Sequence, residues 1–351
     1  MKTLLHLVPL ALVAGALGCS LWRPSTVAGR GHIRLVGRWD ASHAPDRIVA
    51  VNPGSSFEFR YRGTSCVLLF DRSANPPYGG PLPQLWVQFD GAWTKHVLDR
   101  DRLVLGTDAA PGRHQVWVIL KSADEHQARW TPPLVASLTL TGVEVPGGKL
   151  LEPPRRRKLI LEAIGDSITE GILVYKEGKD WPDRADSRFT YAFRTAEALG
   201  AEPRIIGFGA QGLTHGGNGG TPAVGLAYPF VYKDVPAEEA PADVVVINQG
   251  CNDGGAKSIE TLYLGLIRLA RRRNPDAHIF CLIPFAQVHA RSIGAAVVSA
   301  RADWDTKVYL VRTQGWLDPK ADTTDGVHPS AEGHTKAAEK LTAFIRATLG
   351  R

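Results

Sequence analysis

The chain has 351 residues, of which 44% are hydrophobic and 22% are charged, as in ordinary globular proteins and unlike disordered or fibrous ones. Its length predicts two domains. The net charge of +6 is mildly basic, but its dense runs are confined to residues 155–158 and 271–273. This distribution argues against nucleic-acid binding, which needs a concentrated basic surface.

The first residues are typical of an export signal. Lys2 precedes an apolar stretch at residues 4–17 that is too short to span a bilayer comfortably. The stretch ends at Cys19, after small and apolar residues that resemble a bacterial lipobox, with Ala16 where such motifs prefer leucine. We predict a signal peptide at residues 1–19 and a secreted or periplasmic protein. Two alternatives remain open, secretion without an anchor and a lipid anchor at Cys19. This anchor would be the one predicted link of the protein to a membrane.

Residues 28–147 predict an all-β sandwich domain of the jelly-roll kind. Short runs of alternating apolar and polar residues recur with turn signals such as Asp90-Gly91 between them, and no helical periodicity interrupts them. The runs lie at residues 56–61, 65–70, 84–89, 114–120 and 135–141. Residues 148–157 contain Pro153-Pro154 and predict a linker to a second domain at residues 158–351.

Five of the nine tryptophans fall in this first domain, at positions 39, 86, 93, 117 and 130. Aromatic faces stack on sugar rings, so a carbohydrate-binding surface is one interpretation. Trp86 and Trp117 stand in alternating apolar runs, which favours a place in the core. For the other three, core and sugar platform remain open.

The second domain begins with an apolar run at residues 158–164 that predicts a buried parallel strand. Residues 165–171 follow with the sequence GDSITEG, which places Ser167 at the carboxyl edge of a sheet, where open α/β sheets bind ligands. Backbone N–H groups at that edge can stabilise an oxyanion. Ser167 is therefore a candidate nucleophile and Asp166 a candidate substrate contact. The alternative is that Asp166 or Ser167 only caps a helix.

Two further strands should end in loops beside that serine. The run at residues 204–208 opens into a loop of small residues, in which Gly209 or Ala210 can offer a backbone N–H at close range. The spacing of Gly207, Gly209 and Gly212 matches a dinucleotide fingerprint, but a flexible glycine-rich loop follows instead of the required helix.

The strand predicted at residues 243–248 leads to Asn252, whose side-chain N–H could meet an oxyanion. A turn rich in Gly, Asn and Asp for conformational reasons is the alternative. Near the C-terminus, Asp325 and His328 could supply an orienting carboxylate and a base, ahead of a helix predicted from Ser330 to about residue 349.

Four blocks in this order, GDSITEG, GFGAQG, GCND and DGVHP, resemble the SGNH (GDSL) hydrolase superfamily. The resemblance implies a flavodoxin-like three-layer α/β/α fold and ester hydrolysis through an acyl-serine. It implies a catalytic triad of Ser167, Asp325 and His328. The oxyanion hole would comprise the N–H of Ser167, the N–H of Gly209 or Ala210, and the Asn252 amide.

With a β-sandwich ahead of it and the Gly37-Arg38-Trp39 opening, the chain also resembles the second carbohydrate esterase family. That resemblance implies removal of O-acetyl groups from polysaccharides such as xylan. An insertion at residues 175–182 places Trp181 beside the nucleophile, as a sugar platform or as a hydrophobic plug over the domain joint.

We therefore expect an exported serine esterase acting on acetylated carbohydrate, without a cofactor and, since no Cys or His cluster has ligand spacing, without a metal. A generalist esterase or lipase and a non-catalytic carbohydrate-binding protein are the alternatives. Cys251 and Cys281 could pair, because export permits disulfides.

Overall fold

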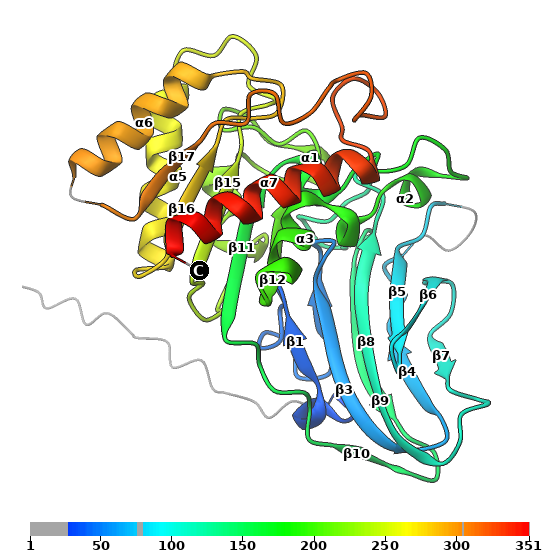
Figure 1. Cartoon of the computed structure of the whole chain (residues 1–351). Helices are drawn as coiled ribbons and strands as arrows, with labels where there is room; N and C mark the ends of the chain where they lie inside the picture. Colours follow the sequence, from blue (N-terminus) through cyan, green and yellow to red (C-terminus); the bar gives the residue numbers. More distant parts are fainter. Residues whose placement is uncertain (1–26, 76–79, 304, 351) are drawn as a thin grey trace, which may run out of the picture.

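The computed structural model describes residues 27–75, 80–303 and 305–350 in two parts, an N-terminal β region and a C-terminal α/β region (Figure 1). The predicted signal peptide, including Cys19, lies outside the described residues. No helix in the described part of the chain is long and apolar enough to cross a membrane.

The β region consists of two antiparallel sheets. One has the strand order β1-β3-β8-β5-β6, with β10 also pairing with β3, and the other has the order β2-β9-β4-β7. Alternate residues of both sheets fill one core, in which Phe57, Phe59 and Tyr61 of β3 are fully buried. The strands are β1 (Arg34–Val36), β2 (Ile48–Ala50), β3 (Ser56–Gly63), β4 (Cys66–Phe70), β5 (Gln84–Phe89), β6 (Ala92–Val97), β7 (Arg102–Leu105), β8 (Gly112–Ser122), β9 (Leu138–Glu144) and β10 (Lys149–Leu151), with a 3₁₀ turn at Arg30–His32.

Two boundaries differ from the sequence prediction. The strand expected from residue 135 begins at Leu138, because the backbone bends at residues 135 and 136 and the Ser137 hydroxyl donates to the carbonyl of Leu134. The predicted linker is partly a strand, since β10 pairs with β3. The turn that makes this possible has Gly147 at a φ of 66°, in the left-handed region that glycine adopts without strain.

The α/β region is built on five parallel strands in the order β12-β11-β15-β16-β17. Numbered from the start of the region this is 2-1-3-4-5, the flavodoxin-like order of doubly wound sheets. Helices cover both faces, as predicted. The sheet strands are β11 (Leu159–Gly165), β12 (Ala201–Gly207), β15 (Val244–Asn248), β16 (His278–Leu282) and β17 (Val308–Val311), beside a small hairpin of β13 (Phe230–Tyr232) and β14 (Val235–Pro236).

The long helices divide between the two faces because neighbouring strand residues point in opposite directions. α5 and α6 pack with Ile164 and Ile247, whereas α3 and α7 pack with Ala163 and Val246. Ser330 caps α7 as predicted, accepting the Gly333 N–H at 3.1 Å. The helices are α1 (Ser167–Glu170), α2 (Trp181–Arg184), α3 (Tyr191–Ala198), α4 (Val224–Ala227), α5 (Ile259–Arg273), α6 (Ala290–Ala302) and α7 (Ala331–Leu349), with 3₁₀ turns at Ser187–Phe189 and Asn218–Gly220.

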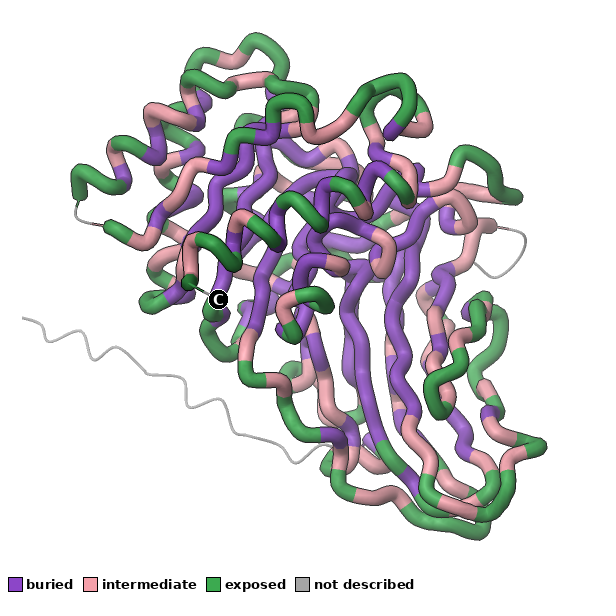
Figure 2. The backbone as a smooth tube through the Cα atoms, viewed as in Figure 1, coloured by how far each residue is buried: buried purple, intermediate pink, exposed green. Residues whose placement is uncertain are grey.

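The two regions share their cores. Trp117 and Ile119 of β8 pack in the same apolar cluster as α3 and α7, and Trp130 packs with residues of the α/β sheet. Buried backbone runs from the α/β sheet into the adjoining ends of the β-region strands (Figure 2). The regions are therefore joined by shared buried side chains as well as by the chain that connects them.

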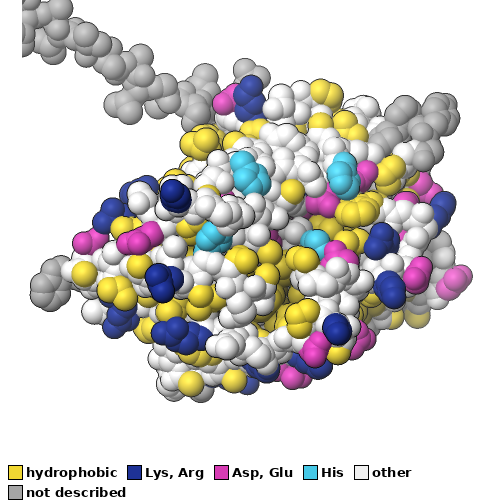
Figure 3. Space-filling model, turned by 90° about the horizontal axis from the view of Figure 1, so that it is seen from above, with side chains coloured by type: hydrophobic (Ala, Val, Ile, Leu, Met, Phe, Trp, Pro, Cys, Tyr) yellow, Lys and Arg dark blue, Asp and Glu magenta, His cyan; other side chains and the backbone are white. Residues whose placement is uncertain are grey.

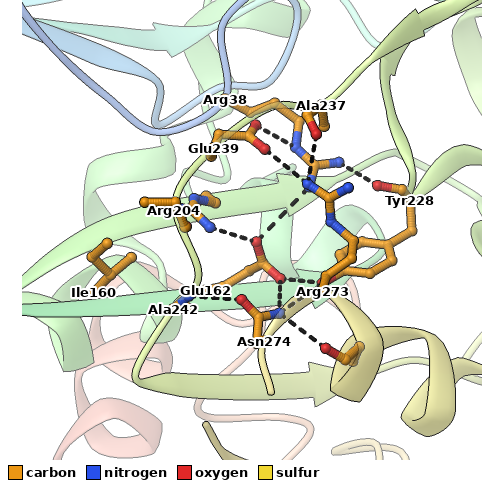
Figure 4. A network of polar contacts seen from close by, with 12 residues as sticks. Arg38, Ile160, Glu162, Arg204, Tyr228, Ala237, Glu239, Ala242, Arg273 and Asn274 are labelled. Atoms are coloured by element: carbon orange, nitrogen blue, oxygen red, sulfur yellow. Dashed lines mark hydrogen bonds and ion pairs between the residues drawn. The ribbon is translucent and has the colours of Figure 1, made fainter. Parts of the chain in front are cut away.

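A polar network in the joint is centred on Glu162, a fully buried residue of β11 (Figure 4). Its carboxylate lies 3.0 Å from Arg204 on β12 and 3.8 Å from Arg38 of the β region, and accepts hydrogen bonds from Tyr228 and Asn274. Burial by itself raises the pKa of this carboxyl, but the two guanidinium groups outweigh burial, so the pKa of Glu162 is lowered and the network is ionised.

We predict that Glu162→Ala destabilises the fold by about 3–5 kcal/mol, because it leaves two buried guanidinium groups without their shared counterion. Denaturant unfolding at neutral pH measures the change. The matched control is Arg268→Ala, which removes an exposed pair with Asp303 and should cost less than about 1 kcal/mol. An equal loss of unfolding free energy in both variants would contradict the role of Glu162 as the shared counterion of the buried network.

Candidate active site

Ser167 stands where β11 turns into α1. Gly165 ends the strand, and a Cβ there would lie 1.9 Å from the Thr169 hydroxyl oxygen, so the tight turn needs glycine. Asp166 caps α1 by accepting the Ile168 N–H at 3.1 Å. The two sequence interpretations thus coexist, since the aspartate caps the helix while the serine side chain points to His328.

The structure brings Ser167, His328 and Asp325 into one hydrogen-bonded chain. Ser167 Oγ lies 2.9 Å from His328 Nε2, and His328 Nδ1 lies 2.8 Å from Asp325 Oδ2. The second carboxylate oxygen of Asp325 accepts the N–H groups of Val327 and His328 at 3.0 and 2.8 Å. Gly326, at a φ of 92°, lets four consecutive residues close this turn. Partial burial raises the pKa of Asp325, but the hydrogen bonds from His328 and Val327 outweigh it and hold this pKa below its usual range.

Asn252 lies in the loop that follows β15, the strand next to β11. Its amide nitrogen donates one hydrogen bond to the Gln211 carbonyl at 3.0 Å, which leaves the second N–H of the NH₂ group for another acceptor. The next residue, Asp253, accepts the N–H groups of Leu213 and Thr214 at 3.0 and 2.8 Å. The loops after β12 and β15 are thereby fastened to each other.

The choice between Gly209 and Ala210 depends on where each N–H points. The Gly209 N–H donates to Glu170 Oε2 at 2.8 Å, inside the protein. The Gly209 carbonyl accepts the Asn218 N–H at 2.8 Å, so the Ala210 N–H of the same trans peptide points the opposite way. Within the described residues, the N–H groups of Ala210 and Ser167 have no hydrogen-bond acceptor. The geometry therefore favours Ala210 over Gly209 as the second backbone donor.

The two candidate substrate contacts are both packed into the protein. Asp166 is 1% exposed and serves as a cap, so its carboxylate does not face a substrate. Trp181 is half-buried against Ile172, Leu173 and Ala185. The Trp181 ring packs against the His126 ring of the β region in an edge-to-face arrangement, with 5.0 Å between the ring centroids. This placement corresponds to a plug over the joint rather than a free sugar platform.

Three residues near the site were missed by sequence reasoning. Arg129 forms a buried ion pair with Glu170, and Glu125 lies against Gly209. Glu170 belongs to the GDSITEG block, but its ion-pair partner, Arg129, comes from a loop of the other region. No local pattern in the sequence pairs them.

The carboxyl-end loops form the face seen from above in Figure 3, where histidine side chains gather near the middle and most lysines and arginines lie towards the margin.

Trp39, Trp117 and Trp130 are each 7% exposed and belong to the core, while Trp86 and Trp93 are half-buried. The three cysteines of the described chain are free, so the possible pairing of Cys251 with Cys281 is not formed. No group of side chains in residues 27–75, 80–303 and 305–350 could hold a metal ion.

The α/β region is similar to a known protein family. Residues 163–336 match the GDSL-like Lipase/Acylhydrolase family. This domain belongs to that family. The matched range contains the four candidate site residues Ser167, Asn252, Asp325 and His328.

The similarity to individual proteins extends over the β region too. The chain is 32% identical over 347 residues to the cellulase/esterase CelE of Acetivibrio thermocellus, covering 90% of this chain but only 39% of that protein. It is 27% identical over 255 residues to an acetylxylan esterase/glucomannan deacetylase of Cellvibrio japonicus, covering 67% of each. The structure of a family two carbohydrate esterase from Clostridium thermocellum in complex with cellohexaose superimposes with a TM-score of 0.75 at 28% identity, covering 91% of this chain and 99% of that one.

Asp166 predicts a pH-dependent stability. Burial raises its pKa to about 7, although the Ile168 N–H and His328 partly oppose this. The unfolded carboxyl loses its proton near pH 4, so between the two values the unfolded state holds fewer protons and stability falls as pH rises.

We therefore expect Asp166→Asn, which keeps a good cap, to gain about 2–4 kcal/mol relative to the wild type between pH 4 and pH 8. Denaturant unfolding across this pH range measures the gain. Asp276→Asn, at an exposed position, should show no such trend. A parallel pH dependence in wild type and Asp166→Asn would contradict the prediction.

Proposed function

We propose that this protein is a serine esterase that removes O-acetyl groups from carbohydrate. The observation that carries the proposal is the chain of hydrogen bonds from Ser167 through His328 to Asp325. The similarity to family two carbohydrate esterases supports the substrate class, because it covers both regions of the chain. The chain spans about two fifths of the length of CelE, so the proposal concerns the part that the two share.

The first chemical step forms an acetyl-serine. Neutral His328 accepts the Ser167 proton at Nε2 while Asp325 holds the Nδ1–H tautomer. The serine oxygen attacks the acetyl carbonyl, and the resulting oxyanion accepts hydrogen bonds from the N–H groups of Ser167 and Ala210 and the Asn252 amide. The imidazolium then protonates the departing sugar oxygen as the ester bond breaks.

The second step releases acetate. With the sugar gone, water can approach the acetyl-serine carbonyl, and His328 takes a proton from that water as general base. The same three donors stabilise the second oxyanion, and each such donor is typically worth about 2.7–4 kcal/mol in the transition state. Collapse of this intermediate returns the proton to Ser167 and frees acetate.

We also propose that the β region is a jelly-roll sandwich and that the protein is exported. The first proposal is supported by two packed antiparallel sheets whose neighbours are mostly not consecutive in the chain. The second is supported by the apolar run behind Lys2, which leaves a lipid anchor at Cys19 open.

Ser167→Ala tests the reaction. The Ser167 side chain makes its hydrogen bond to His328 and alanine keeps the backbone, so we expect stability within about 1 kcal/mol of wild type. Acetate release should fall at least about a thousandfold. Ser330→Ala, which removes the α7 cap, should lower stability by about 1 kcal/mol and retain activity. Wild-type acetate release by Ser167→Ala would contradict the nucleophile assignment.

The substrate class is tested by comparing kcat/KM for acetylated xylan and glucomannan oligosaccharides, for aryl acetates and for long-chain esters. We expect the acetylated oligosaccharides to exceed the aryl acetates by about a hundredfold, because a site that hydrogen-bonds sugar hydroxyls loses those bonds with aryl groups. Equal values would favour a generalist esterase. Glycan binding without acetate release from any substrate would favour a non-catalytic binding protein.

A further inference from the structure

A buried ion pair links the β region to the helical turn that carries the nucleophile. Arg129, on the segment between β8 and β9, is fully buried, and Glu170, at the end of α1, is 1% exposed. Two guanidinium nitrogens of Arg129 donate to the two carboxylate oxygens of Glu170, one of them at 2.8 Å. Such a two-pronged pair fixes orientation as well as distance. Arg129 also lies over the Phe208 ring, 4.9 Å from its centroid.

Glu170 has a second partner in the loop after β12. Its Oε2 accepts the Gly209 N–H at 2.8 Å. The backbone N–H of Arg129 donates to the Gly219 carbonyl at 3.2 Å, and the adjacent Asn218 N–H donates to the Gly209 carbonyl at 2.8 Å. Arg129 therefore holds this loop directly at Gly219 and through Glu170 at Gly209.

The restraint determines where the Ala210 N–H points. Ala210 has a φ of 56°, an unfavourable conformation for alanine that the surrounding contacts must enforce. A Cβ at position 209 would lie 1.3 Å from Glu125 Oε2, another β-region atom, so the glycine cannot gain a side chain without moving that carboxylate. Glu125 of the β region therefore lies against Gly209, in addition to the restraint that Arg129 exerts through Glu170.

We propose that Arg129 and Glu170 are positioning residues that set the oxyanion-hole N–H of Ala210. The inference rests on the proposed esterase function. A preorganised donor stabilises charge that develops only in the transition state, so a small displacement of this N–H should lower kcat more than it changes KM. The β region then contributes to catalysis through Arg129 without touching the substrate.

The test compares Arg129→Lys with Arg38→Lys in the full chain, using an aryl acetate and an acetylated xylo-oligosaccharide. Lysine keeps the charge but loses the planar fork. Since a displacement of about 1 Å can cost about a hundredfold in rate, we expect kcat to fall about 10- to 100-fold with KM within about twofold. Unfolding curves establish the folded fraction of each variant.

Arg38 is the matched control. It is 1% exposed and also joins the β region to the α/β region, through Glu239 at 3.0 Å and Glu162 at 3.8 Å, on the side of the joint that Figure 4 shows. Its described contacts do not include the loop after β12. Arg38→Lys should lower the unfolding temperature while kcat of the folded protein stays within about twofold of wild type.

A neutral double variant covers the case in which Arg129→Lys does not fold. Arg129→Met with Glu170→Gln removes both buried charges while the glutamine carbonyl can still accept the Gly209 N–H. It should fold and still lose kcat at least about tenfold, because the two-pronged restraint is gone.

Wild-type kcat in either folded Arg129 variant would overturn the positioning role, as would an equal fall in kcat for Arg38→Lys. A wild-type protein that releases no acetate from either substrate would instead contradict the proposed function itself. The two failures are therefore distinguishable in one set of assays.

Discussion

The contact between the β region and the α/β sheet depends on buried carboxylates of the α/β region that pair with arginines of the β region. Glu170 lies next to the turn that carries Ser167, with Arg129 of the β region as its partner. Glu162 lies in β11, with Arg204 of the same region and Arg38 of the β region among its partners. An isolated charge in such surroundings is expensive, so each carboxylate requires its arginine. The apolar clusters around Trp117 and Trp130 then exclude water from the same joint.

Through this contact the two regions contribute different residues to the site. The α/β region supplies Ser167, the Asn252 loop and the turn that carries His328, each after the carboxyl end of a strand or ahead of α7. The β region supplies Arg129 and Glu125, which lie against the loop between β12 and α4. The side chains that we propose to react thus come from one region, and part of the rigidity that we propose for them comes from the other.

Much of the site could be predicted because its parts are local. The strand ending at Gly165, the Asp325-to-His328 turn and the Ser330 cap each depend on neighbours within a few residues. Parallel topology then brings strand ends to one edge, so Ser167 and Asn252 were expected together. One prediction failed because of a contact across the chain, since residues 149–151 pair with β3 as β10. For Asp166 the structure shows the alternative interpretation, a buried cap, in place of a substrate contact.

The sequence by itself determined the parallel sheet with its flanking helices, the turn that carries Ser167 and the residue types of the predicted triad. These features depend on hydrophobic periodicity and on turn residues, both of which involve neighbours in the chain. Only the tertiary structure decided between Gly209 and Ala210 as the oxyanion donor. The Gly209 N–H already donates to Glu170, whereas the Ala210 N–H has no acceptor among the described residues. The tertiary structure also decided that Trp181 packs against His126 in the joint. Both outcomes depend on residues that are far apart in the chain, Glu170 with Gly209 and His126 with Trp181. Such residues come into contact only in the folded protein, so a local sequence pattern does not predict that they pair.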